Sequence, residues 1–236
     1  MRRWTVEPGA LDLAELALSP EASKHARRVL RLQDGETVEL RDGAGGAAEA
    51  RLTDGGRRFA IERRRPARVR SSLQIILAQA VAKADKMDEV VRSAAELGVA
   101  RLRPFVSERT VPRKEKAVAR WRRLAEDALR VSGRWFRMEV DEVVLLDDLL
   151  GEPRQFGLVA VPGGGLSVPE LLQASPPPET SLVIGPEGGF SPAELERLEN
   201  GGFRSLDLGE AILRTQTAGH ALVAALTLGW GLTETE

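Results

Sequence analysis

Two glycine-containing loops, each directly after a short apolar run, contain the residue types whose spacing suggests chemistry. The first loop covers residues 185–190 and reads GPEGGF after the run SLVI. The second covers residues 209–217 and reads GEAILRTQT after the run SLDL. Glycine adopts φ > 0 readily and lets a ligand approach the main chain where a Cβ would block it. The loops therefore predict a small-molecule site built largely from backbone groups.

The loops do not match the common nucleotide-binding fingerprints. No G-x-G-x-x-G opens a helix and no Lys-Ser/Thr pair follows the glycines, so NAD and ATP fit poorly. The chain has no cysteine and only two histidines, which excludes a thiolate nucleophile and argues against a metal site. A ligand of nucleotide type is favoured at this point, and ordinary turns are the alternative.

The elements around the loops indicate an α/β domain over residues 69–236. Strand and helix patterns alternate from residue 71 onward, which is typical of a parallel sheet that binds ligands at the carboxyl ends of its strands. One predicted helix should end at Gly98, and another should bury Trp121, Leu124, Ala128 and Val131. The strands are predicted at 73–79, 99–106, 158–161, 181–184 and 205–208, and the helices at 83–97, at 114 to about 133, after Pro192 and after Thr215.

Residues 1–68 are predicted to form a smaller, mainly β domain. A helix should interrupt it, with Ser19 as N-cap and Pro20 at the first helical position, and run to about Leu32. Its apolar residues Ala26, Val29, Leu30 and Leu32 are expected to face the core. The arginine-rich stretch 63–70 is interpreted as a linker between the domains. The predicted strands lie at 37–40, 49–52 and 59–62, with turns at 42–46 and 54–56.

Charge is strongly segregated although the net charge is only −1. Residues 1–140 hold 30 Lys and Arg against 20 Asp and Glu, a balance of +10, and residues 141–236 hold 4 against 15, a balance of −11. A basic half is typical of proteins that bind nucleic acid, although a chance drift of surface charge is the alternative. No apolar run is long enough to cross a membrane and no signal peptide is evident, so a cytoplasmic protein without a membrane partner is expected.

The sequence resembles the RsmE family of SPOUT methyltransferases. LVIGPEGGFS at 182–191, with Glu194 after it, is similar to one family signature, and Leu208-Gly209 with ILRT at 212–215 is similar to a second. ELGV at 96–99, SER at 107–109 and His25 with VLR at 29–31 also fit. Three positions depart from the family pattern: Gln216 stands where Glu is usual, residues 130–134 lack a preceding Glu-Gln, and Met138 replaces a frequent Pro.

This resemblance implies a fold, a cofactor and a substrate. The fold would be an N-terminal PUA-like β-barrel and a SPOUT-type parallel sheet with a C-terminal trefoil knot. The cofactor would be S-adenosyl-L-methionine, and the protein would be a homodimer that methylates N3 of a single uridine in 16S rRNA, within the 30S subunit. The cofactor-binding residues implied are Gly185, Glu187, Gly188, Gly189, Leu208, Ile212, Leu213 and Thr217.

Arg214 is the best candidate for a catalytic residue of such a reaction. Loss of the N3 proton leaves negative charge on the uracil oxygens, which a cation would stabilise, and Arg214 is one of four basic residues after position 140. A structural ion pair with Glu187 or Glu210 is the alternative. No general base stands out, and His220 is interpreted as a packed residue. The residues interpreted as RNA-binding are Arg3, Lys24, His25, Arg28, Arg31, Lys86 and Arg134.

Two other functions remain open from the sequence. One is a SPOUT methyltransferase that acts on a ribose 2′-oxygen of tRNA. The other is an RNA-binding assembly protein with a vestigial cofactor pocket, which Gln216 and the unusual 130–138 segment would favour. Trp135, next to Arg134, is interpreted as a core or dimer contact, with base stacking as its alternative role.

Overall fold

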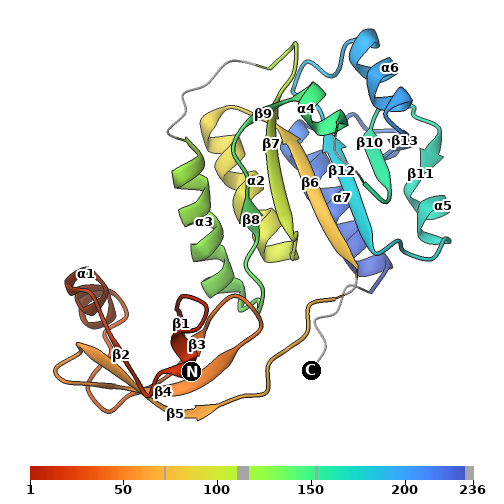
Figure 1. Ribbon diagram of the computed structural model, residues 1–236. Coiled ribbons are helices and arrows are strands. Elements are labelled where there is room, and N and C mark those ends of the chain that lie inside the picture. The colour runs from red at the N-terminus through yellow and green to blue at the C-terminus, as the bar shows by residue number, and fades with distance from the viewer. Residues whose placement is uncertain (72, 111–116, 152–153, 232–236) are drawn as a thin grey trace. The chain divides into compact units, whose positions relative to one another are not determined.

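The chain separates into two compact units. The computed structural model describes residues 1–71, 73–110, 117–151 and 154–231 (Figure 1). The N-terminal unit contains residues 1–70 together with residues 129–137, and the C-terminal unit contains the described residues of 71–128 and 138–231. Residues 129–137, which the sequence analysis placed in the C-terminal domain, therefore cluster with the N-terminal unit. The domain boundary at residue 68 stays a prediction.

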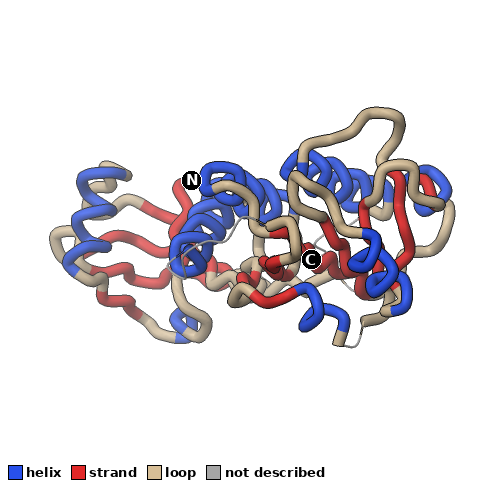
Figure 2. Tube along the Cα trace, turned by 90° about the horizontal axis from the view of Figure 1, so that it is seen from above, coloured by secondary structure: helices blue, strands red, loops and turns tan. Residues whose placement is uncertain are grey.

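A five-stranded sheet forms most of the N-terminal unit. The predicted strands at 37–40, 49–52 and 59–62 are all present. Their inward residues stabilise them by burial, since Leu40, Leu52 and Phe59 are each 0% exposed. Two short edge strands were missed, since three or four residues show no clear alternation. The sheet order is β1 (Arg2–Thr5), β3 (Thr37–Arg41), β4 (Ala47–Thr53), β5 (Arg58–Arg64) and β2 (Glu15–Ala17), drawn in red in Figure 2.

The helix of this unit starts as predicted and ends differently. Ser19 accepts a hydrogen bond from the Ala22 N–H at 3.1 Å and so caps α1 (Pro20–Lys24). The chain then widens into a π-helical turn, His25–Val29, and leaves the helix where Arg31 adopts a left-handed φ of 53°. The wider turn rotates the side chains, so Val29 is 65% exposed and not in the core as the helical pattern predicted.

Residues 129–137 contribute Trp135 to the core of the N-terminal unit. Two guanidinium groups lie over the Trp135 ring, with Arg41 Cζ at 4.4 Å and Arg68 Cζ at 4.3 Å from its centroid. The backbone also pairs, since Gly45 N donates to Trp135 O at 3.2 Å and Arg137 N to Gly43 O at 2.8 Å. Trp135 is also 8% exposed, so its burial and its two guanidinium contacts support the core role over base stacking.

Arg41 joins these contacts to a buried carboxylate. It is 8% exposed, donates from Nε to Glu39 Oε1 at 2.7 Å, and donates from Nη1 to the carbonyl oxygens of Gly133 and Arg134. Glu39 itself is 6% exposed, and among the described residues its second cation is Arg65, whose Nη1 lies 3.9 Å from Glu39 Oε1. A buried ion pair is strongly destabilised when one partner is removed, because the other charge stays desolvated.

Arg41→Met should therefore destabilise the N-terminal unit by about 3 kcal/mol, since it leaves Glu39 and two backbone carbonyls without their donor. Urea unfolding followed by tryptophan fluorescence measures the effect. Arg57→Met is the matched control, because Arg57 is exposed and its side chain has no hydrogen bond or ion pair within the described part of the chain. Equal midpoints for the two variants would contradict the structural role of Arg41.

A parallel sheet organises the C-terminal unit, as predicted (Figure 1). Strand β12 (Glu179–Ile184) pairs with both β10 (Gly157–Ala160) and β6 (Gln74–Ala80), and β10 pairs with β13 (Phe203–Asp207), all in parallel. Strand β9 (Val144–Leu145) pairs with β7 beside β8. The order along the sheet is β11 (Leu166–Ser167), β13 (Phe203–Asp207), β10 (Gly157–Ala160), β12 (Glu179–Ile184), β6 (Gln74–Ala80), β7 (Arg101–Val106) and β8 (Glu139–Val140).

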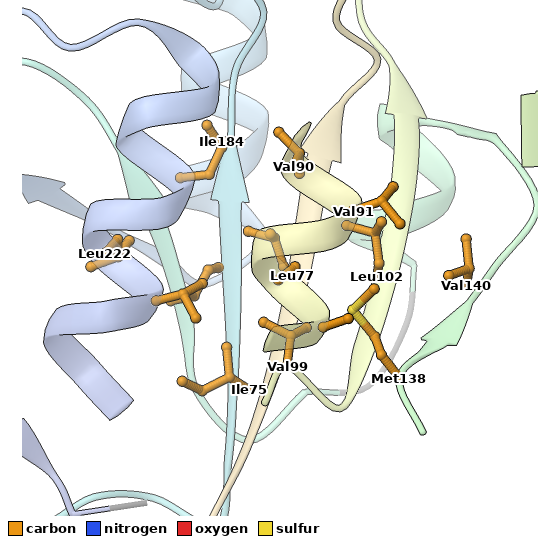
Figure 3. Packing of buried hydrophobic residues seen from close by; sticks show 14 of the residues in the cluster. Ile75, Leu77, Val90, Val91, Val99, Leu102, Met138, Val140, Ile184 and Leu222 are labelled. Atoms are coloured by element: carbon orange, nitrogen blue, oxygen red, sulfur yellow. The ribbon is translucent and has the colours of Figure 1, made fainter. Parts of the chain in front are cut away.

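Helices cover both faces of this sheet. One face packs against the helices of the larger core, a cluster that includes Leu77 of β6, Val91 and Leu222 (Figure 3). On the other face Ala78, Phe105 and Val183 pack against two shorter helices. The first group is α2 (Ala84–Leu97), α3 (Ala117–Ser132), α5 (Val168–Leu172) and α7 (Thr215–Gly229), and the second is α4 (Leu146–Leu150) and α6 (Pro192–Asn200).

The helix predictions hold in their main features. Gly98 ends α2 with a left-handed φ of 87°, and Trp121 and Ala128 of α3 are buried. Val131 is 67% exposed, so its predicted burial is wrong, and the predicted start of α3 at Lys114 lies outside the described residues. No helix in the described part of the chain is both long and apolar enough to cross a membrane.

Candidate functional site

Five strands of the parallel sheet end at one cavity of about 860 Å³. The loops that follow β13 and β12, which carry the two glycine motifs, form most of its wall, and Val161 and Pro162 after β10 lie between them. Lys83 comes from the loop after β6 and Arg109 from the loop after β7. The cavity lies within the C-terminal unit, and its volume is in the range of sites that hold drug-sized ligands.

The cavity brings together most of the predicted site residues. Arg214 lines it, and so does Lys86, which the sequence analysis assigned to RNA binding. Thr217 is exposed and does not line the cavity. Thr215, which the sequence analysis placed in the second signature without assigning it a role, lines the wall beside Arg214. The predicted cofactor-binding residues on the wall are Gly185, Glu187, Gly188, Gly189, Leu208, Ile212 and Leu213.

The first loop is tightly folded against neighbouring side chains. Gly189 has a left-handed φ of 66° and donates to Pro186 O at 2.9 Å. A Cβ at Gly185 would lie 2.9 Å from the Phe190 ring, and that ring stacks on Phe105 with centroids 6.3 Å apart. At these two glycines the backbone conformation or the close packing excludes larger residues, as the sequence pattern indicated.

A buried carboxylate holds the outer side of this loop. Glu194 is 1% exposed and accepts from the Ser191 N–H at 2.8 Å and the Glu108 N–H at 2.9 Å, which ties the loop after β7 to the start of α6. Arg109 donates from Nη1 to Gly188 O at 2.8 Å. The resemblance included Glu194 and residues 107–109, and the structure gives both a role in fixing the glycine loop.

The second loop presents Arg214 at the cavity. Gly209 has φ 106°, and the Asp207 carboxylate before it accepts from the Gly163 N–H at 3.2 Å. Arg214 is exposed, precedes the first turn of α7, and forms no ion pair with any residue the structure describes, Glu187 and Glu210 included. The positive end of a 15-residue helix dipole lies at the same place.

The charged side chains on the cavity wall are mainly cationic. Lys83, Lys86, Arg109 and Arg214 line it, against Glu187 and Asp207. This contrasts with the acidic balance of residues 141–236, because Lys83, Lys86 and Arg109 come from the basic half of the sequence. The arrangement suits a ligand or substrate that develops negative charge near the cavity.

The other predicted RNA-binding residues belong to the N-terminal unit. Lys24, Arg28 and Arg31 are exposed around the π-helical turn, and His25 is half-buried with its ring 5.7 Å from the edge-on Trp4 ring. Arg3 is exposed and its guanidinium lies against Gly133. Arg134 is partly buried, and its carbonyl oxygen accepts a hydrogen bond from Arg41 Nη1. Their assignment to RNA stays a prediction.

His220 lies in α7 away from the cavity wall, as expected of a packed residue. Burial lowers the pKa of His220, which outweighs the opposing effects of Glu89 and Glu96 of α2 and of a hydrogen bond to the Glu89 backbone. Its Nε2 atom is buried and has no hydrogen-bond partner among the described residues. The neutral imidazole is therefore the form that the folded state favours.

Glu194→Gln should lower the stability of the loops around the cavity, because an amide oxygen can accept one of the two bonds while its NH2 faces the other N–H. We expect a loss of about 1–3 kcal/mol in urea unfolding. Glu196→Gln, an exposed change in the same helix, should have almost no effect. If both variants unfold alike, Glu194 does not anchor the loop.

Stability should also decrease in mild acid through His220. Its pKa is lowered on folding, so below the unfolded value of about 6.5 the unfolded chain binds the proton more readily. Stability is thus complete above that pH and is lost as the pH falls toward the folded pKa. Urea midpoints at pH 7.5 and 5.5 should differ less in His220→Gln than in the parent protein; an equal difference would exclude His220 as a cause.

Two family sequence models match the chain. One, described as an RNA methyltransferase domain, matches residues 69–227. The other, described as an RNA methyltransferase PUA domain, matches residues 18–61. Together they cover the unit that contains the cavity and most of the five-stranded sheet.

Curated relatives agree with these models. A ribosomal RNA small subunit methyltransferase E from Aquifex aeolicus is 36% identical over 144 residues, which cover 59% of this chain and 62% of that protein. A protein of the same name from Synechocystis is 28% identical over 231 residues, which cover 95% of this chain and 76% of that protein. The match thus spans less than two thirds of the Aquifex protein.

Solved structures match over nearly the whole chain. A ribosomal RNA small subunit methyltransferase E from Neisseria gonorrhoeae bound to S-adenosyl methionine has a TM-score of 0.88 and 29% identity, with 98% of both chains covered. A Legionella pneumophila protein described as a methyltransferase with bound SAM has a TM-score of 0.84, 31% identity and 96% coverage of both. These matches confirm the predicted α/β fold with its N-terminal PUA-like domain. The chain belongs to the RNA methyltransferase family, and within it is similar to the RsmE proteins.

Proposed function

We propose that this protein is an S-adenosylmethionine-dependent methyltransferase that methylates N3 of a single uridine in 16S rRNA. The observation that carries the proposal is the convergence of the two glycine loops, 185–190 and 209–217, on one cavity with Arg214 on its wall. The similarity to ribosomal RNA small subunit methyltransferases E supports the choice of substrate. The ribose 2′-oxygen of tRNA has no such support.

The residues around the cavity suit S-adenosylmethionine. Main-chain groups of Gly185, Gly188 and Gly189 can bind its polar atoms, and apolar Ile184, Leu208 and Leu213 can contact its base. The tight packing of Gly185 against Phe190 keeps the backbone at the surface of the cavity. When bound, this cofactor supplies a methyl group that is already activated on a sulfonium. The protein's task is therefore mainly to position the substrate.

Arg214 is assigned to stabilising the uracil as its N3 proton leaves. The negative charge then resides on O2 and O4, and a guanidinium without an ion-pair partner among the described residues can donate to either oxygen. The N-terminus of α7 adds to the positive potential. No histidine lines the cavity, and we assign no general base.

The N-terminal unit is proposed to bind the rRNA through Arg3, Lys24, His25, Arg28, Arg31 and Arg134, with Lys86 acting at the cavity. The basic balance of residues 1–140 favours this division. The base must be unpaired or pulled from its stack to present N3. A homodimer, a 30S substrate, a cytoplasmic location and a C-terminal trefoil knot complete the proposal, on the resemblance to the RsmE family.

Arg214→Ala should keep cofactor binding and lose most methyl transfer. Removal of a preorganised cation at the reacting base lowers turnover by about 10²–10³, whereas the glycine loops that hold the cofactor are unchanged. Titration calorimetry with S-adenosylhomocysteine measures binding, and transfer of labelled methyl groups to 30S subunits measures activity.

Arg204→Ala is the matched control, since Arg204 is exposed on β13 and does not line the cavity; it should keep both properties. Unchanged transfer by Arg214→Ala would remove Arg214 from the mechanism. Nucleoside mass spectrometry of the product separates N3-methyluridine from a 2′-O-methylated nucleoside. A parent protein that binds no S-adenosylhomocysteine would instead indicate an assembly protein with a vestigial pocket.

A further inference from the structure

A chain of three hydrogen-bonding groups connects the centre of the sheet to both loops of the cavity. Gln79 of β6 donates from Nε2 to Thr215 Oγ1 at 2.8 Å, and Thr215 donates from Oγ1 to Gly185 O at 2.5 Å. Gly185 is the first residue of the first loop, and Thr215 lies in the second loop at the start of α7. These contacts join segments that are 136 and 30 residues apart in sequence.

The two side chains are shielded from water and Gly185 is partly buried, so the direction in which each side chain donates its hydrogen bond matters. Gln79 is 0% exposed and Thr215 is 5% exposed. Gln79 shares its face of β6 with Ile75 and Leu77, the face that α7 covers, because side chains alternate along a strand. An amide among aliphatic side chains is unfavourable unless it is hydrogen-bonded, so this position needs an explanation beyond core packing.

The orientation of the Gln79 amide follows from its neighbours. Its Nε2 lies 3.3 Å from Ala80 O, and a carbonyl can only accept, so the NH2 group must be on that side. The same NH2 group then donates to Thr215 Oγ1. Because the single Thr215 hydroxyl hydrogen is left free, it points to Gly185 O. Gln79 therefore determines which way the Thr215 hydroxyl donates.

Gly219 allows this arrangement to form within α7. A Cβ at residue 219 would lie 3.0 Å from Gln79 Oε1, which is tighter than ordinary contact. The Oε1 atom has no hydrogen-bond partner in the described chain. A buried amide that leaves its oxygen unpaired while both bonds of its NH2 group are made indicates that those bonds determine its position.

We propose that Gln79 and Thr215 are positioning residues of the cofactor site, which hold the first loop against the start of α7. We call the hydrogen-bonded chain from Gln79 through Thr215 to Gly185 O the relay. It fixes the position of the Gly185 backbone relative to that of residues 213–215, and both line the cavity. Glu194 and Arg109 hold the outer side of the first loop, and the relay holds its inner side. The inference rests on the proposed function, because its test uses a cofactor product.

Thr215→Val tests the relay, since valine has the same shape and neither donates nor accepts. We expect S-adenosylhomocysteine to bind at least about tenfold more weakly by calorimetry, because the buried Gln79 amide and the partly buried Gly185 carbonyl lose their partner. Thr215→Ser should restore binding to within about threefold, because serine keeps the hydroxyl. Thr227→Val is the matched control. It removes another buried hydroxyl of α7, which donates to Leu97 O and does not line the cavity.

The kinetic split distinguishes positioning from general stability. Loss of the relay should raise the KM for S-adenosylmethionine and leave turnover at saturation nearly unchanged, whereas Arg214→Ala should lower turnover. Circular dichroism checks that each variant is folded. If Thr215→Val does not fold, Gln79→Met replaces it, because methionine has a similar length and fits an apolar core; it should weaken binding in the same way.

The proposal is overturned if the folded valine or methionine variant binds within threefold of the parent protein, or if serine at 215 binds as weakly as valine. Equal weakening by Thr227→Val would also overturn it, since the effect would then come from α7 stability. Failure of the parent protein to bind S-adenosylhomocysteine is a different result, which contradicts the proposed function and not the relay alone.

Discussion

Parallel pairing between β13, β10, β12, β6 and β7 is the constraint on which the site depends. Because these strands point the same way, their carboxyl ends lie at one edge and the loops that follow them must meet there. The two glycine loops follow β12 and β13, which are separated only by β10. Residues 185 and 209, which lie far apart along the extended chain, therefore line one cavity. Reversal of any of these strands would remove its loop from the site.

Two glycine-containing loops form most of the cavity wall, so the shape of the cavity depends on what fixes their backbone. The first loop is held on its outer side by Glu194 and Arg109 and on its inner side by Thr215 and Gln79. Glu194 comes from α6 and Thr215 from α7, whereas Arg109 follows β7 and Gln79 is part of β6. Glycine provides the close approach, but it adds flexibility. Buried hydrogen bonds to the loops offset that flexibility and favour one conformation.

The N-terminal unit uses charge in a different way. Arg41 and Arg68 both contact the Trp135 ring, and the buried Glu39 carboxylate pairs with Arg41. Arginines that a sequence-level count assigns to an RNA-binding surface are thus partly structural. Lys24, Arg28 and Arg31 remain exposed around the π-helical turn. The segment 129–137, whose departure from the family pattern left its role open, has a defined place as a partner of the turn at 42–46.

Several features could be predicted from the sequence because they are local. Gly98 ends α2 and Ser19 begins α1, since caps depend on a few neighbouring residues. The strand patterns at 37–40 and 181–184 and the alternation of strands and helices indicated the two kinds of sheet. Edge strands β1 and β2 and the π-helical turn were missed, because their periodicity is too short or is altered by packing. Val29 and Val131 were placed in the core by helical periodicity and are exposed.

The sequence by itself determined which residues are proposed to carry the chemistry: the glycines, Arg214 and the resemblance to a methyltransferase family are visible without coordinates. Only the tertiary structure decided how they are held. Gln79 and Thr215 are 136 residues apart, and no local pattern marks an amide in the middle of an apolar strand as the partner of a distant hydroxyl. Thr217, which the family motif favours, is exposed and does not line the cavity, whereas Thr215 does. The physical reason is that strand order and helix rotation are set by long-range packing, which sequence spacing does not encode.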